Sequence, residues 1–155
     1  MRSATTIMSA AGDNLLPKCA IWTRRRKVVR GTARVLVVDD YADTADAISM
    51  VLTLCGFEAD AVYSGLLAID ATVRCKPDVV LLDIWMPEMS GLEVAARLRA
   101  DANTSGTILI AHSAAASEAD LERARQAGFD AFCAKPTDAT TFAPLLRHFV
   151  SELIA

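Results

Sequence analysis

The chain has 155 residues, enough for one domain with a substantial core, and 53% of them are hydrophobic. No apolar run approaches the ~20 residues that a helix needs to cross a bilayer, which argues against a membrane protein. Asp13, Asn14 and Lys18 interrupt the N-terminal region where a secretory signal would be apolar. We therefore expect a cytoplasmic protein.

Charge is unevenly distributed along the chain. Residues 1–33 carry seven basic residues and one acidic residue, whereas the rest carries nine basic and eighteen acidic residues. The first segment shows no sustained periodicity, and we interpret residues 1–33 as a basic, mostly disordered extension that precedes a domain over 34–155. Its Arg24–Lys27 run has two interpretations. It could bind nucleic acid or an acidic surface, or it could be part of a solvated tail. The acidic domain itself is not expected to bind nucleic acid.

From residue 34 onward, strand and helix patterns alternate five times. The predicted strands cover residues 34–38, 58–62, 79–82, 107–112 and 131–134. The predicted helices cover residues 41–55, 66–73, 92–98, 117–128 and 142–153. Ser117 and Asp120 have the spacing of a capping box, and Pro144 in the last helix requires either a kink or a later start.

Five strand–helix units without turn-linked strand pairs predict an α/β fold, a doubly wound five-stranded parallel sheet with helices on both faces. Residues 58–62 alternate polar and apolar side chains, as an edge strand with one solvated face does. An edge position for this strand favours the flavodoxin-like order 2-1-3-4-5. In that order the first and third strands lie side by side, and ligands bind beyond the carboxyl ends of the strands.

Four of the predicted strands end in residues that can carry chemistry. Asp39 and Asp40 follow the first strand, Asp83 the third, Ser113 the fourth and Lys135 the fifth. Three adjacent carboxylates repel one another unless a cation holds them, and Mg²⁺ is the hard, oxygen-seeking ion that suits them. One carboxylate could then attack a phosphoryl group to give an aspartyl phosphate, while the amine and the hydroxyl bind the phosphoryl oxygens.

The strand ends carry four motifs, which are Val-Asp-Asp at 38–40, Leu-Leu-Asp-x-x-Met-Pro-x-Met-x-Gly at 81–91, Ser-Ala at 113–114 and Lys-Pro at 135–136. Together they resemble the receiver domain of two-component response regulators, over roughly residues 34–155. The resemblance implies that Asp83 is the phosphoacceptor and that Asp40 binds Mg²⁺ directly, while Asp39 helps through water. It also implies that the backbone carbonyl of Trp85 is the remaining protein ligand of the metal.

The same resemblance implies roles around the phosphoryl group. Ser113 would be the switch hydroxyl, Lys135 the phosphate-binding amine and Phe132 the switch aromatic, and the Lys135–Pro136 bond would be cis. Trp85 is larger than the Met or Asn that the family commonly places at this position. We predict that its indole shields the phosphoryl group from water and gives a long-lived phosphoprotein. The alternative is an indole that lies in solvent as a partner contact.

The resemblance predicts a stand-alone receiver without an attached output domain. A sensor histidine kinase or a histidine phosphotransfer protein would supply the phosphoryl group, and a downstream protein would bind around the fourth helix, fifth strand and fifth helix. Because the reaction is a self-directed phosphoryl transfer with slow self-hydrolysis, we do not expect an enzyme.

Two alternatives remain at this point. One is a receiver-like interaction module that works unphosphorylated, and the other is a Mg²⁺-dependent phosphatase with an Asp nucleophile. Phosphatases of the haloacid-dehalogenase type expect Asp-x-Asp after the first strand, where this chain has adjacent Asp39 and Asp40.

The cysteines and histidines predict no second site. The four cysteines lack metal-binding spacing, and we expect free, mostly buried thiols in a reducing cytosol. His112 and His148 lack partners at metal or triad spacing and are interpreted as structural, although His112 precedes the predicted switch hydroxyl. The cysteines are Cys19, Cys55, Cys75 and Cys133.

Overall fold

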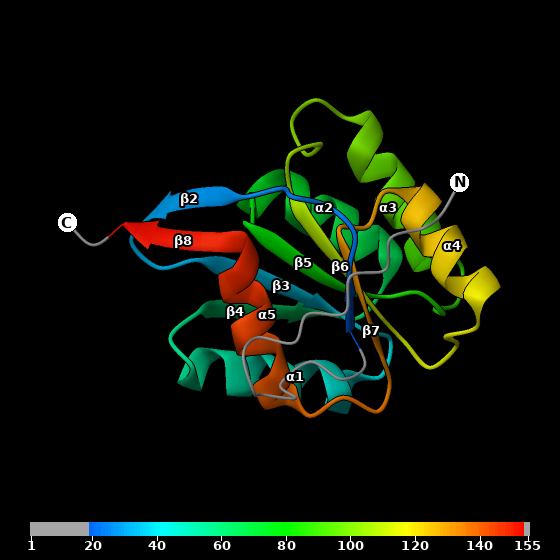
Figure 1. Cartoon of the computed structure of the whole chain (residues 1–155), viewed down its shortest axis with the longest axis horizontal. Coiled ribbons are helices and arrows are strands. Elements are labelled where there is room, and N and C mark those ends of the chain that lie inside the picture. Colours follow the sequence, from blue (N-terminus) through cyan, green and yellow to red (C-terminus); the bar gives the residue numbers. More distant parts are fainter. Residues whose placement is uncertain (1–18, 154–155) are drawn as a thin grey trace.

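The computed structural model describes residues 19–153, which form a central β-sheet with helices on both faces (Figure 1). The strands are β1 (Cys19–Ile21), β2 (Lys27–Arg30), β3 (Arg34–Val38), β4 (Glu58–Val62), β5 (Val79–Asp83), β6 (Ile108–Ser113), β7 (Ala131–Ala134) and β8 (Val150–Leu153). The helices are α1 (Ala42–Leu54), α2 (Gly65–Cys75), α3 (Gly91–Ala100), α4 (Glu118–Ala127) and α5 (Phe142–Phe149), with a short 3₁₀ helix, η1 (Ala139–Thr141), before α5.

The parallel strands confirm the predicted fold class. β4, β3, β5, β6 and β7 lie side by side in the expected order 2-1-3-4-5, and each neighbouring pair is parallel. β4 lies at one edge, where exposed Glu58 and Asp60 account for its alternating pattern. The predicted sheet of five strands is nevertheless incomplete, because β1 adds a sixth, antiparallel strand beside β7.

The prediction of a disordered extension is wrong for residues 19–33, while residues 1–18 lie outside the described part of the chain. Residues 19–30, which we call the N-terminal strap, begin as β1 beside β7 and end as β2 beside β8 (Figure 1). All three residues of β1 are buried. A strand of three residues is too short to show a periodic pattern, so the sequence does not reveal it.

The basic run of the strap contacts acidic side chains of the same chain. Arg25 Nε donates to Asp130 Oδ1 at 3.0 Å, and Lys27 Nζ lies 3.6 Å from Asp78 Oδ1. For these two side chains the structure therefore favours the interpretation as a contact to an acidic surface, and that surface belongs to the protein itself.

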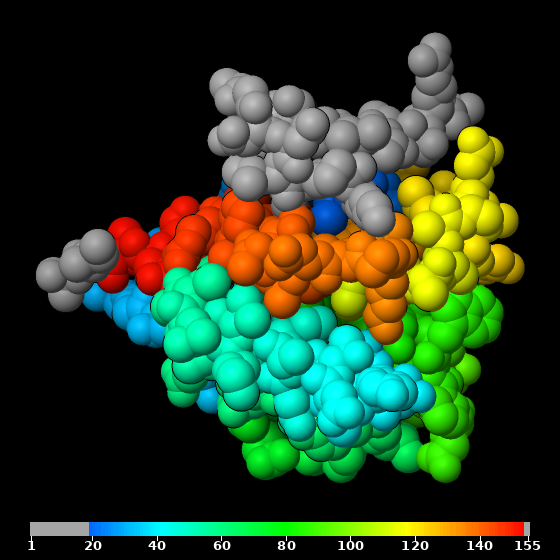
Figure 2. All heavy atoms as spheres, turned by 90° about the horizontal axis from the view of Figure 1, so that it is seen from below, coloured from blue at the N-terminus to red at the C-terminus, as the bar shows by residue number. Residues whose placement is uncertain are grey.

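Alternate residues of the central strands point to opposite faces of the sheet and build two apolar layers. On one face, residues such as Val37 and Leu81 pack with α1 and α5. These two helices lie side by side in the middle of Figure 2, in cyan and orange. On the other face, residues such as Leu36 and Val80 pack with α2, α3 and α4. Full burial of one such side chain is worth about 1.5–3 kcal/mol, so these two layers supply most of the driving force for folding.

The starts of the last two helices, α4 and α5, follow local sequence signals. Ser117 and Asp120 form the predicted capping box of α4. α5 begins at Phe142, so Pro144 lies in its first turn and the interpretation of a late start is confirmed. The predicted continuation of this helix to residue 153 is wrong, because the chain leaves α5 after Phe149 and pairs with the strap as β8.

Within residues 19–153, no helix is both long and apolar enough to cross a membrane.

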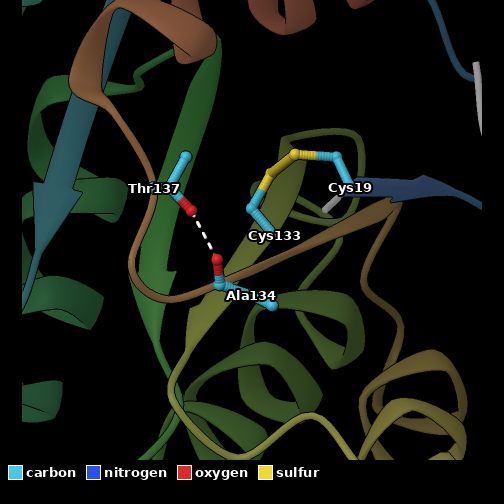
Figure 3. The surroundings of a disulfide bond; sticks show 4 residues. All are labelled: Cys19, Cys133, Ala134 and Thr137. Carbon is cyan, nitrogen blue, oxygen red and sulfur yellow. Dashed lines mark hydrogen bonds between the residues drawn. A yellow bond between two sulfur atoms is a disulfide. The ribbon is translucent and has the colours of Figure 1, made fainter. Parts of the chain in front are cut away.

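The expectation that all four cysteines are free is wrong. Cys19 and Cys133 form a disulfide (Figure 3). Cys55 and Cys75 carry free thiols. The pairing of β1 with β7 places the two linked residues opposite each other, with 4.2 Å between their Cα atoms. They are 114 residues apart in the sequence, so no spacing motif signals the bond.

Candidate functional site

The carboxyl ends of four parallel strands meet at one edge of the sheet. Val38 of β3 is paired with Leu82 of β5, so Asp39 and Asp83 follow side by side at the same level. Ser113 ends the neighbouring strand β6 and is paired with Ala134, the residue before Lys135. The sheet register therefore brings the predicted residues to one place.

Three carboxylates form the centre of this site. Asp39, Asp40 and Asp83 each offer an oxygen, and these atoms all lie within 4.8 Å of one another. Asp39 and Asp83 are buried, at 2% and 6% exposure, whereas Asp40 is exposed. Asp39 Oδ1 also accepts the backbone N–H of Tyr41 at 2.9 Å, which fixes its orientation at the start of α1. Two buried carboxylates and one exposed one suit a hydrated cation that enters from solvent.

Lys135 supplies the positive charge of the site. Its Nζ donates to Asp39 Oδ2 at 2.9 Å and lies 3.5 Å from Asp83 Oδ2. Burial alone lowers the pKa of this amine, but the contacts with Asp39 and Asp83 outweigh burial and the pKa is raised above 10.5. The side chain is therefore an ammonium group at neutral pH. The Lys135–Pro136 bond that follows is cis, as expected.

The negative charge of Asp83 is disfavoured by its surroundings, as its raised pKa shows. Burial raises the pKa of its carboxyl from 3.8 to about 6, Lys135 opposes this shift, and the neighbouring charges of Asp39 and Asp40 add to it. The backbone N–H of Trp85 donates to the carboxylate and favours the charged form. Burial is the largest cause of the raised pKa, and the two neighbouring acids add to it. Three carboxylates this close together form a donor set that fits a divalent cation.

Gly91 allows the loop after β5 to close tightly over the strand end. Its N–H donates to the carbonyl of Ile84 at 2.7 Å, and a Cβ at this position would collide with the carbonyl oxygen of Asp83. The Ser90 side chain accepts the N–H of Glu93 and caps α3 directly after the loop. The glycine of the 81–91 motif is thus needed to let α3 begin beside Asp83.

Ser113 and Phe132 lie on the face of the sheet that α4 covers. Ser113 is fully buried, and its Oγ accepts the backbone N–H of Ala115 at 3.3 Å. Phe132 is 1% exposed and is paired in register with Ala111, two residues before Ser113. The predicted switch pair therefore shares one layer of packing. Sequence reasoning missed the neighbour of this aromatic, Trp22 of the strap, whose ring centroid lies 6.0 Å from that of Phe132.

Trp85 is 59% exposed, which favours the interpretation of its indole as a partner contact over that of a shield. The metal-ligand role of its carbonyl stays a prediction. His112 is buried with its ring edge-on to Phe142, and its Nε2 has no hydrogen-bond partner within residues 19–153. Burial, and next to it the charge of Lys135, lowers the pKa of His112 to about 4. A neutral imidazole in apolar packing agrees with a structural role.

Comparison with known proteins identifies the family. The family model described as the response regulator receiver domain matches residues 35–147. This chain belongs to the response regulator receiver family. The match begins after the N-terminal strap, which is therefore an addition of this receiver to the matched domain.

Related proteins agree with this assignment. The receiver is 32% identical over 121 residues to the polar-differentiation response regulator DivK of Brucella ovis, a match that covers 78% of this chain and 98% of the relative. The solved structure of the Vibrio cholerae chemotaxis protein CheY4 shares its fold, with a TM-score of 0.73, 24% identity, and coverage of 77% of this chain and 99% of that one. The signal receiver domain of a putative Luxo repressor protein from Vibrio parahaemolyticus gives a TM-score of 0.69 at 27% identity, covering 76% of this chain and 90% of that one.

Proposed function

We propose that this receiver is a phosphoaspartate switch in a two-component phosphorelay. A sensor histidine kinase or a histidine phosphotransfer protein supplies the phosphoryl group, Asp83 accepts it, and a downstream protein reads the changed surface around α4, β7 and α5. The observation that carries the proposal is the meeting of Asp39, Asp40 and Asp83 within 4.8 Å, with the Lys135 ammonium 3.5 Å from the acceptor.

Mg²⁺ is the proposed cofactor, held by Asp39, Asp40, Asp83 and the backbone carbonyl of Trp85. The cluster of acids and the raised pKa of Asp83 support this choice, since a divalent cation would relieve their mutual repulsion. When bound, the ion would neutralise negative charge on the transferred phosphoryl oxygens.

The side chains divide the remaining work. A carboxylate oxygen of Asp83 attacks phosphorus in line with the donor imidazole, so an O–P bond forms while the N–P bond breaks and the imidazole leaves. The Lys135 ammonium, already 3.5 Å from the acceptor, binds one phosphoryl oxygen, and the Ser113 hydroxyl donates to another. The inward movement of Ser113 then makes room for Phe132, which shares its face of the sheet, and shifts the receiver toward its active state.

This chemistry modifies the protein itself rather than turning over a separate substrate, so we propose a signalling switch and not an enzyme. We also propose that it acts in the cytoplasm. A receiver-like module that works without phosphorylation would bind its partner regardless of Asp83, and a phosphatase would turn over generic phosphomonoesters.

Labelling with acetyl phosphate in Mg²⁺ tests the proposal. Wild type should gain one hydroxylamine-sensitive phosphoryl group by intact-mass analysis, and Asp83→Asn should gain none, because the nearly isosteric amide is not a nucleophile. Asp70→Asn is the matched control, since Asp70 is an exposed carboxylate on α2 that pairs with Arg74. Label that persists on Asp83→Asn would refute the assignment of the acceptor.

A further inference from the structure

The free edge of β7 is covered by the protein's own N-terminal strap. β1 pairs with it antiparallel, and Cys19, Ala20 and Ile21 lie opposite Cys133, Phe132 and Ala131. The disulfide joins the first of these pairs (Figure 3). The strap thus covers the edge of β7, the central strand of the surface through which we propose that the receiver signals.

The strap also contacts the predicted switch aromatic. Cys19 and Ile21 join the apolar layer beneath α5, whereas Trp22 packs in the layer beneath α4. The Trp22 ring lies 6.0 Å from the Phe132 ring, at an interplanar angle of 45°. Residues 19–22 therefore bridge both sides of β7 and add packing against Phe132.

Beyond residue 22 the strap is anchored without the disulfide. The Thr23 hydroxyl donates to the Asp130 carboxylate at 2.6 Å. Arg25 and Arg99 form ion pairs with the same buried carboxylate at 3.0 and 2.8 Å. The described contacts of residues 19–22, by contrast, are a three-residue strand pairing, the hydrogen bond from the Trp22 N–H to the Asp130 carbonyl at 2.8 Å, side-chain packing and the disulfide. A change at the disulfide should act on residues 19–22 and leave 23–30 in place.

We propose that Cys19–Cys133 is a redox modification site, at which a dithiol reductant releases residues 19–22 from β7. A thiolate of the reductant attacks Cys19 Sγ, the Sγ–Sγ bond breaks, and Cys133 leaves as a thiolate that takes up a proton. The second thiol of the reductant resolves the mixed disulfide, which leaves Cys19 as a thiol and the reductant oxidised by two electrons. Both cysteines are buried, at 4% exposure for Cys19 and 0% for Cys133, so we expect attack on the less buried Cys19 when the edge strand β1 opens transiently.

Release would leave one edge of β7 unpaired, with a row of backbone N–H and C=O groups open to solvent. It would also remove Trp22 from Phe132, so that the aromatic responds more freely to phosphorylation. This second consequence rests on the proposed function, whereas the release of the strap does not.

Hydrogen–deuterium exchange of the full chain tests the release. Protein oxidised with diamide should show two free thiols after denaturation, those of Cys55 and Cys75, and dithiothreitol should raise this number to four. Reduction should speed exchange in peptides covering 19–22 and 131–134 by at least tenfold, with residues 27–30 unchanged. Cys19→Ser should show the fast exchange in both conditions, and the matched control Cys75→Ser should behave as wild type. Four free thiols in the oxidised protein, or an acceleration below tenfold in wild type, would overturn the proposal.

A second arm separates this inference from the proposed function. Beryllofluoride with Mg²⁺, a mimic of the phosphoryl group, should change exchange in α4 of the reduced protein at least threefold more than in the oxidised protein. No response in either redox state would refute the phosphoryl switch while leaving the release of the strap to the first arm. An equal response in both states would show that the disulfide is not coupled to the switch.

Discussion

Neutralising Asp83 should stabilise the metal-free protein. The carboxyl is 6% exposed, and burial raises its pKa from 3.8 to about 6. A shift of about two pH units means that the buried carboxylate destabilises the folded state by about 3 kcal/mol at neutral pH. Asp83→Asn removes the charge and leaves Lys135 with its 2.9 Å hydrogen bond to Asp39, so little is lost in return.

The pH dependence gives the sign of this effect. Because the folded pKa of Asp83 lies above the unfolded one, its contribution to stability is fully present below about pH 4 and is lost as pH rises through about 6. The advantage of Asp83→Asn over wild type should therefore grow from about 1 kcal/mol at pH 4.5 to about 3 kcal/mol at pH 7.5.

Urea unfolding followed by circular dichroism, in buffer with a chelator, measures this advantage at both pH values. Asp70→Asn on the exposed face of α2 is the control and should track wild type. Saturating Mg²⁺ should stabilise wild type through mass action and leave Asp83→Asn nearly unchanged, because the variant has lost a ligand. An advantage that is the same at both pH values, or a variant less stable than wild type at pH 7.5, would contradict the electrostatic origin.

Three further outcomes follow from the site. Asp40→Ala should weaken Mg²⁺ binding about tenfold or more, read from tryptophan fluorescence, whereas Asp43→Ala in the first turn of α1 should not; equal midpoints for both variants would exclude Asp40 as a ligand. Ser113→Ala should still accept phosphate but show a smaller change of amide exchange in α4 with beryllofluoride, and an undiminished change would remove Ser113 from the switch. Trp85→Asn should lose phosphate within about twofold of the wild-type rate, since the indole is 59% exposed, and a tenfold faster loss would restore the shielding hypothesis.

The parallel part of the fold could be predicted because each of its strands leaves a local signature. The apolar run of β5 cannot face water on either side, and the alternation in β4 marks an edge. Once the strand order is set, the positions of Asp39, Asp83 and Lys135 follow from the register alone. The site was predictable because it consists of strand-end residues in a sheet of known handedness.

The strap could not be predicted because its structure depends on partners far along the chain. β1 has three residues and β2 has four, too few for a pattern, and β2 has its partner in β8. The pairing of Cys19 with Cys133 spans 114 residues. The apolar positions after Phe149 fit a continued helix and a strand equally well. Pairing with β2 is what makes this segment the strand β8.

Asp130 gives one basic residue of the N-terminal segment, Arg25, a role in the fold. This carboxylate is fully buried, and it accepts the Thr23 hydroxyl, the two guanidinium groups of Arg25 and Arg99, and the backbone N–H of Leu109. A buried charge with fewer donors would be costly, since loss of one partner from such a pair typically destabilises a protein by about 3–5 kcal/mol. Arg25, together with Lys27 near Asp78, is thus part of the domain's own charge balance, and these contacts help to hold the strap beyond residue 22 in place. Because residues 23–30 stay fixed, the disulfide of Cys19 alone can control whether residues 19–22 cover β7.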